Sequence, residues 1–136
     1  MKKTIVKPFI FTLIPMHLDF NNVYQAGIKV ACFNAGADCE RVDESIFAEG
    51  ALERFNTQIT KANIIISDVT GRNPDVLFET GFACALKKQV ILLTQNVNDI
   101  PFDIKHYPHI LYDENIVRLR EEIEKRLQWN NLTKFL

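Results

Sequence analysis

The stretch SDVTGRNPDVLFETG, from Ser67 to Gly81, holds the residues best suited to chemistry. Asp68 follows a run of three isoleucines, and Glu79 stands among bulky apolar residues. A carboxylate in apolar surroundings near a ligand-binding edge is a candidate nucleophile or general base. Most glutamates point into water, and strand-end aspartates often cap the next turn. Glu79 and Asp68 are nevertheless the candidate catalytic residues.

The turn between these two carboxylates predicts an anion site. Gly71 allows close approach of the main chain, and Arg72 adds a positive charge. Asn73 can cap a helix that begins at Pro74, and helix N-termini attract anions. The turn therefore either binds a phosphate or carboxylate or simply joins two elements. Asp75, at i−4 from Glu79, predicts a second carboxylate along the same helix face.

Apolar runs and helical spacings alternate along the chain and predict the elements that position these residues. Alternation of this kind predicts parallel strands with right-handed crossovers. We therefore expect a single domain over residues 1–136: a three-layer α/β sandwich whose five-stranded parallel sheet has the flavodoxin-like order 2-1-3-4-5. The predicted strands are Phe9–Ile14, a short one at Cys39 and Val42, Asn63–Ser67, Gln89–Leu93 and Pro108–Tyr112. The predicted helices are Phe20–Ala35, Ala51–Thr60, one that begins at Pro74, and Asn115–Trp129.

That sheet order brings the loops after the first, third and fourth strands to one edge, where ligands bind in open α/β sheets. These loops are Pro15–Asp19, Asp68–Asn73 and Gln95–Asp99. The last belongs to a longer polar segment, Gln95–Tyr107, whose length suggests a function or a packed surface loop. Asp43, after the second strand, either holds a ribose hydroxyl or is an exposed acid beside Glu44.

Composition excludes several classes of function. A net charge of −1 over 136 residues argues against a nucleic-acid partner. No apolar stretch is long enough to span a membrane, and the start of the chain reads as a strand rather than a signal peptide. Three cysteines without CxxC spacing suit reduced thiols in the cytoplasm. The three histidines are scattered, so we expect no metal site, and no cofactor motif is present.

The run ANIIISDVTGRNPDVLFETGFACAL resembles the pattern ADxVIxDxTGxNPNVxxELGxAxAL of the nucleoside 2-deoxyribosyltransferase-like superfamily, especially its bacterial branch labelled TIR-like. The resemblance extends to FTLIPM, CERVDE and IPFDIKHY. It implies that Glu79 attacks the anomeric carbon of a sugar or stabilises its positive charge, and that Asp68 helps to hold the sugar. It also implies sugar or phosphate contacts from the loop of Pro15 and Met16, and a homo-oligomer, at least a dimer, whose neighbours complete the pocket.

One position departs from the superfamily pattern. The transferases carry an acid on the helix before the third strand, whereas Phe55 to Asn63 contains none and Glu53 is the nearest. A cationic nicotinamide leaves without protonation, so the gap weakens the transferase interpretation more than an NAD-cleaving one. The leading hypothesis is N-glycosidic cleavage or transfer on a nucleoside, nucleotide or NAD-like ligand. The alternative is a non-catalytic nucleotide-sensing or TIR-like interaction module.

Overall fold

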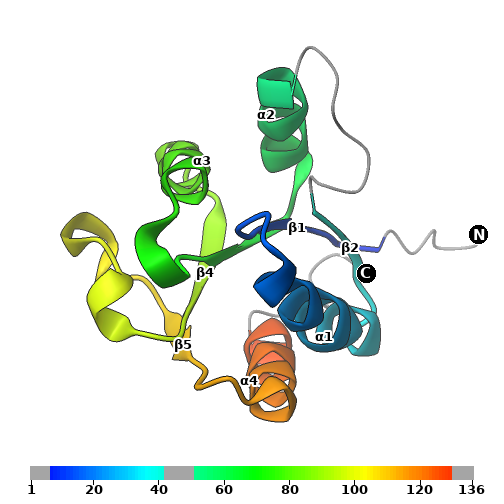
Figure 1. Ribbon diagram of the computed structural model, residues 1–136. Helices are drawn as coiled ribbons and strands as arrows, with labels where there is room; N and C mark the ends of the chain where they lie inside the picture. Colours follow the sequence, from blue (N-terminus) through cyan, green and yellow to red (C-terminus); the bar gives the residue numbers. More distant parts are fainter. Residues whose placement is uncertain (1–6, 42–50, 130–136) are drawn as a thin grey trace, which may run out of the picture.

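A computed structural model describes residues 7–41 and 51–129, which are built around a five-stranded sheet (Figure 1). All neighbouring strands run parallel, in the order β2-β1-β3-β4-β5. The predicted sheet and its 2-1-3-4-5 order are therefore confirmed. The strands are β1 (Phe9–Leu13), β2 (Asp38–Arg41), β3 (Ile64–Asp68), β4 (Gln89–Thr94) and β5 (His109–Leu111).

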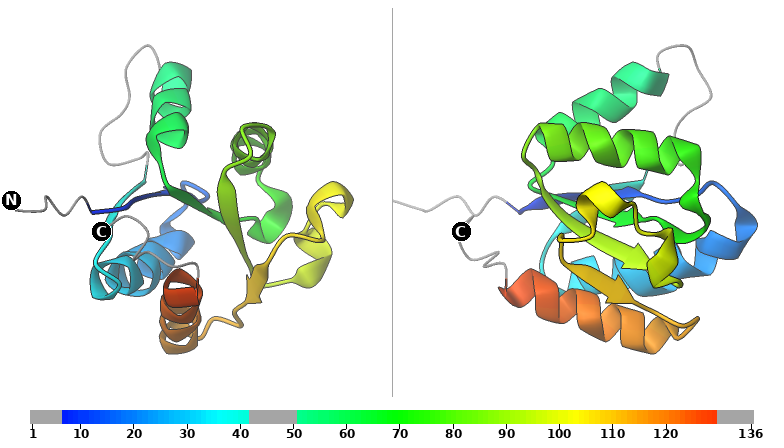
Figure 2. Two further views of the ribbon diagram at one scale, coloured as in Figure 1. Left: turned by 180° about the vertical axis from the view of Figure 1, so that it is seen from behind. Right: turned by 90° about the vertical axis from the view of Figure 1, so that its left-hand side faces the viewer.

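Helices cover both faces of the sheet, which gives the predicted three layers (Figures 1 and 2). α2 (Ala51–Lys61) and α3 (Pro74–Ala85) lie on one face, and α1 (Lys29–Asn34) and α4 (Ile116–Trp129) lie on the other. The chain thus changes faces after β2, and strands β1 and β3, which lead to opposite faces, are neighbours in the sheet. This is the topological switch point at which open α/β folds bind ligands.

The apolar core is divided by the sheet into two clusters. Because side chains alternate along a strand, Ile64 and Ile66 pack toward α1 and α4, whereas Ile65 packs toward α2 and α3. All three isoleucines are fully buried, as expected for a central strand covered on both faces. The α1/α4 cluster includes Tyr24 and Tyr112, and the α2/α3 cluster lies directly beneath the site described below.

Most element boundaries lie within one or two residues of the predicted ones, and three differences affect the path of the chain. The predicted helix Phe20–Ala35 begins with a 3-10 turn, Leu18–Phe20, and passes through a π-helical segment, Val23–Ile28, before α1. β3 extends to Asp68, one residue beyond the predicted end. β2 covers Asp38–Arg41, and the predicted strand position Val42 lies outside the described residues.

The predicted loop Gln95–Tyr107 contains two 3-10 turns, Val97–Asp99 and Phe102–Ile104. Its Ile100 is buried against the α2/α3 cluster, which identifies the segment as a packed surface loop. None of the helices in the two described ranges combines the length and apolar character needed to cross a membrane.

Candidate active site

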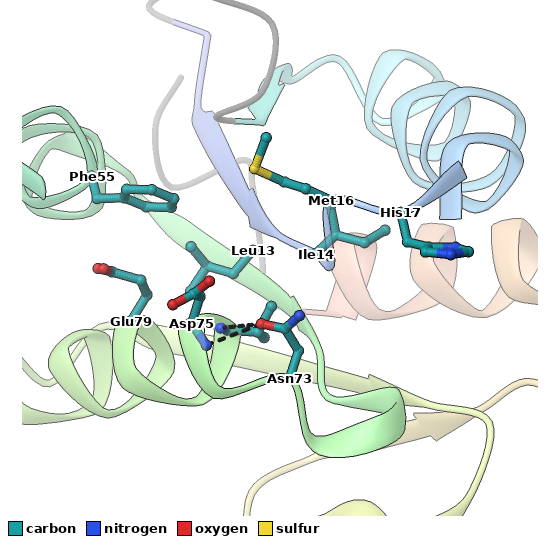
Figure 3. A pocket seen from close by; sticks show the side chains of 9 residues that line it. Leu13, Ile14, Met16, His17, Phe55, Asn73, Asp75 and Glu79 are labelled. Carbon is teal, nitrogen blue, oxygen red and sulfur yellow. Dashed lines mark hydrogen bonds between the residues drawn. The ribbon is translucent and has the colours of Figure 1, made fainter. Parts of the chain in front are cut away.

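A cleft of about 480 Å³ lies at the carboxyl end of β1, between α2 and α3 (Figure 3). Its volume is within the range of about 300–1,000 Å³ that is common for small-molecule sites. The position is the switch point between β1 and β3, so the fold places a cavity where ligands are expected. It is lined by Leu13, Ile14, Met16, His17, Phe55, Asn73, Asp75, Val76 and Glu79.

Glu79 occupies the inner part of this cleft. The residue is only 5% exposed, and its Oε2 has no hydrogen-bond partner among the described residues. Burial, and then the negative charge of Asp75, raise the pKa of the Glu79 carboxyl above its ordinary value. Burying a carboxylate oxygen without a hydrogen-bond partner lowers the stability of the fold. Such an oxygen is therefore available to interact with a ligand that enters the cleft.

Asp75 is the second carboxylate of the cleft, one helical turn before Glu79. In Figure 3, both side chains extend from α3 toward the space near Leu13 and Phe55. Asp75 is exposed, whereas Glu79 is buried, so the pair differs in environment. The expectation that both would share one helix face is met by this arrangement.

A buried hydrogen bond between β3 and α3 fixes the rotation of the helix that carries Glu79. Ser67 Oγ lies 2.5 Å from Thr80 Oγ1, which also donates to the carbonyl of Val76 at 2.6 Å. Thr80 therefore faces the sheet, and its neighbour Glu79 is directed toward the cleft. In the sequence, only the position of Thr80 next to Glu79 pointed to this contact.

Asp68 does not line the cleft. It is fully buried, and its Oδ2 accepts a hydrogen bond from the Tyr112 hydroxyl, which belongs to the α1/α4 cluster. Its Oδ1 accepts from the main-chain N–H of Thr70 at 3.0 Å. Burial raises the pKa of Asp68 above its usual value, and the same burial raises that of Tyr112. This geometry favours a structural role, while a catalytic role for Asp68 stays a prediction.

The donors of the predicted anion turn are already engaged within the chain. The N–H of Gly71 donates to Asp99 Oδ2 at 2.7 Å, and Arg72 donates to the carbonyl of Asn98 at 2.7 Å. Both contacts join the turn to the loop after β4. The turn does bind a carboxylate, but the carboxylate belongs to Asp99, and neither Gly71 nor Arg72 lines the cleft.

The remaining predicted site residues have different positions. Asn73 lines the cleft, and its Oδ1 caps α3 by accepting from the N–H groups of Asp75 and Val76. Met16 is 62% exposed and lines the cleft, whereas Pro15 is buried beside it and is not part of the lining. Asp43 lies outside the described residues.

Phe55 is a lining residue that the sequence did not mark as part of the site, as are Leu13 and Val76. The sequence marks only that the stretch from Phe55 to Asn63 contains no acid. In the structure it lies across the cleft from Met16 and near Glu79 (Figure 3). Its aromatic ring supplies a flat apolar wall, which the pattern of the helix did not distinguish from core packing.

No group of three or more His, Cys, Asp or Glu side chains suitable for a metal ion occurs within residues 7–41 and 51–129.

No protein-family model matches the chain, and no curated protein sequence matches it. Solved structures do match. A 2-deoxyribosyltransferase from Bacillus psychrosaccharolyticus superimposes with a TM-score of 0.64 at 17% identity, over 85% of this chain and 90% of that one. A CMP N-glycosidase from Clostridium botulinum superimposes with a TM-score of 0.61 at 13% identity, over 89% of this chain and 98% of that one. At these identities the likeness shows a shared fold.

Proposed function

We propose that the cleft cleaves or transfers the N-glycosidic bond of a nucleoside, nucleotide or NAD-like ligand, with Glu79 acting at the anomeric carbon. The observation that carries this proposal is the buried Glu79 Oε2, which lacks a hydrogen-bond partner among the described residues and belongs to the lining of a cleft. A carboxylate in such a place can form a bond to carbon or stabilise a developing positive charge.

Two structural neighbours support the choice of reaction. One is a 2-deoxyribosyltransferase and the other is a CMP N-glycosidase, so both act on bonds between a sugar and a base. The stretch Glu79-Thr80-Gly81 adds the sequence resemblance. A shared fold does not specify an activity. We therefore base the assignment of this chemistry to the present chain on the residues of the cleft.

The proposed reaction has two steps. A carboxylate oxygen of Glu79 bonds to C1′ while the C1′–N bond breaks, and the electron pair of that bond leaves with the base. Water then attacks C1′, Glu79 is released as a carboxylate, and a proton from the water passes to solvent. In a transfer, the nitrogen of a second base attacks C1′ instead and loses its own proton. The transition state resembles an oxocarbenium ion, as in glycoside hydrolysis.

A neutral base also needs a proton as it leaves. Asp75, the other carboxyl that lines the cleft, is the proposed donor. It fills the role for which the sequence showed no acid between Phe55 and Asn63. We propose that Asp68 supports the site indirectly. Its carboxyl group accepts a hydrogen bond from the N–H of Thr70 at the start of the turn.

The test is release of free base. Purified protein is incubated with nucleosides, nucleoside monophosphates and NAD, and the products are separated by chromatography. We expect base release that falls by at least about 100-fold in Glu79→Gln, a loss typical of removing a main catalytic group. Glu121→Gln, the same change on the exposed face of α4, is the matched control. Equal rates in wild type and Glu79→Gln would contradict the catalytic role.

The alternative proposal is a nucleotide-sensing or TIR-like interaction module that binds without cleavage. It predicts that a ligand raises the melting temperature and remains intact after long incubation. Assignment to the TIR-like branch stays a prediction under either proposal.

We also propose self-association through the outer face of α3. Phe78 on this face is 64% exposed, and Gly81 is an exposed helix residue with open space where a Cβ would lie. Glycine inside a helix costs about 1 kcal/mol relative to alanine, and nothing within the described chain requires it here. Close approach of a second copy would explain the glycine at position 81.

A further inference from the structure

The side chains that line the cleft carry an unusual balance of charge for a nucleotide site. Within the described residues, the lining contains two carboxylates, Asp75 and Glu79, and neither lysine nor arginine. Resting on the function proposed above, we infer that the substrate is a nucleoside that carries no 5′-phosphate and whose base is positively charged. Three sets of contacts carry this inference.

The N-terminus of α3, where a phosphate would otherwise bind, has most of its main-chain donors absent or used. Pro74 lacks an N–H, and Asn73 Oδ1 accepts from the N–H groups of Asp75 and Val76 at 3.0 and 3.2 Å. The N–H of Leu77 donates to the carbonyl of Asn73 at 3.0 Å. Three of the four N–H positions that a helix N-terminus can offer to an anion, those of Pro74, Asp75 and Val76, are thus absent or used.

Three basic side chains in or next to the lining in sequence have partners within the chain, and one of them, Arg54, lies 4.0 Å from Glu40 Oε2. Arg72 donates to the carbonyl of Asn98, in the loop after β4, and does not line the cleft. His17 does line the cleft, and its Nδ1 accepts from the N–H of Asp19 at 3.2 Å. Asp19 Oδ2 also lies 3.3 Å from this nitrogen, so the imidazole is already next to a carboxylate of the chain itself. A phosphate dianion in this cleft would therefore meet two like charges without a counter-charge.

The two carboxylates and the aromatic ring in the lining of the cleft suit a positively charged ligand. Carboxylates attract a positively charged base, and the face of an aromatic ring such as Phe55 attracts it as well. Figure 3 shows Phe55 on one side of the cleft and Asp75 and Glu79 projecting from α3 on another. An N-glycosylated pyridinium or an N-alkylated purine has both the flat shape and the charge that these walls recognise.

A cationic base also simplifies the chemistry. When the C1′–N bond breaks, its electron pair neutralises the ring nitrogen, so the base leaves uncharged and takes no proton. Water supplies the hydroxyl group at C1′, and one proton is released to solvent. The reaction then requires Glu79 alone as a bond-forming group. Asp75 is a binding group for this substrate, because its negative charge stabilises the bound cation.

The experiment compares three probes that share one base skeleton: nicotinamide riboside, its 5′-monophosphate, and the neutral dihydro form of the riboside. Cleavage of the first two is followed by chromatography, and binding of all three is measured by calorimetry. We expect kcat/KM for the riboside to exceed that for the monophosphate by at least about tenfold, as expected when like charges repel. We also expect the neutral form to bind more weakly than the cation.

Asp75→Asn provides the matched variant. It should weaken binding of nicotinamide riboside while leaving binding of the neutral form nearly unchanged, and Glu121→Gln should change neither. Equal or faster cleavage of the monophosphate overturns the inference even if the proposed function stands. If neither these probes nor the nucleosides, nucleoside monophosphates and NAD tested above release base, the proposed function fails, and the order of binding affinities then tests the inference. Binding of the monophosphate or the neutral form as tightly as the cation then overturns the inference.

Discussion

The main-chain N–H of Gly71 donates a hydrogen bond to Asp99 Oδ2 at 2.7 Å, across two loops at the carboxyl edge of the sheet. The turn after β3 therefore holds an anion that the chain itself supplies. This contact joins the segment before the helix of Glu79 to the loop after β4. The hydrogen bond to Asp99 explains how a turn with the features of a phosphate site can have its N–H group paired without a ligand.

Asp99→Ala should free the N–H of Gly71. Because the contact is exposed, we expect a loss of only about 0.5–1.5 kcal/mol in the free energy of unfolding, measured by urea denaturation. We also expect sulfate to shift the amide resonance of Gly71 in the variant but not in the wild type. Asp103→Ala, an exposed acid in the same segment, should show neither effect.

Glu79→Gln should stabilise the protein at neutral pH. The pKa of Glu79 is raised in the folded state, so the protonated form favours folding. This contribution is complete below the ordinary pKa of a glutamate and is lost as pH rises through the raised value. We expect the variant to melt a few degrees higher than the wild type at neutral pH and at the same temperature in acid. A lower melting temperature at neutral pH would show that Glu79 stabilises the fold.

Asp75→Asn should shift the acid limb of the rate profile. The charge of Asp75 contributes to the raised pKa of Glu79, so its removal lets Glu79 remain a carboxylate at lower pH. The pH at which kcat/KM falls to half should move downward, and the same shift should appear in an NMR titration of Glu79. An unchanged midpoint would mean that burial alone sets this pKa.

The contact between Ser67 and Thr80 can be tested by a double-mutant cycle. Thr80→Val leaves the buried hydroxyl of Ser67 with one partner fewer, and we expect a cost of about 1–3 kcal/mol in the free energy of unfolding. Adding Ser67→Ala should then cost less than it does in the wild type. Additive effects would show that the two hydroxyls are not coupled.

Gly81→Ala separates folding from association. Nothing within 4 Å obstructs a Cβ at this position, so the isolated chain should become more stable by roughly 0.5–1 kcal/mol. If a second copy packs against this face, the same change should shift the molar mass measured by light scattering toward the monomer. Gly27→Ala is the opposite control, because its Cβ would lie 3.0 Å from the side chain of Leu119 and destabilise the fold.

The sheet order and the position of Glu79 could be predicted because both follow from local patterns. Apolar runs that alternate with helical spacings specify parallel strands, and an otherwise apolar helix predicted that Glu79 would be at least half-buried. Asn73 and Pro74 likewise marked the start of α3 through the chemistry of helix ends.

The contacts of Asp68 could not be predicted, because they depend on where β3 ends. The strand includes Asp68, and alternate residues of a strand point to opposite faces. Ser67 therefore faces α3, and Asp68 faces Tyr112. Its hydrogen-bond partner comes from a distant part of the chain, as does Asp99 for Gly71. Pairings of this kind arise from the folded arrangement and leave no mark on local spacing.

The division of the core by the sheet affects which amino-acid substitutions the protein can tolerate. The cleft rests on the α2/α3 cluster, while Tyr112 and Asp68 belong with the α1/α4 cluster on the far side. Substitutions on opposite faces share few partners, so their effects on stability should add to within about 0.3–0.5 kcal/mol. Variation around the cleft can therefore redirect substrate choice while the opposite face preserves the fold.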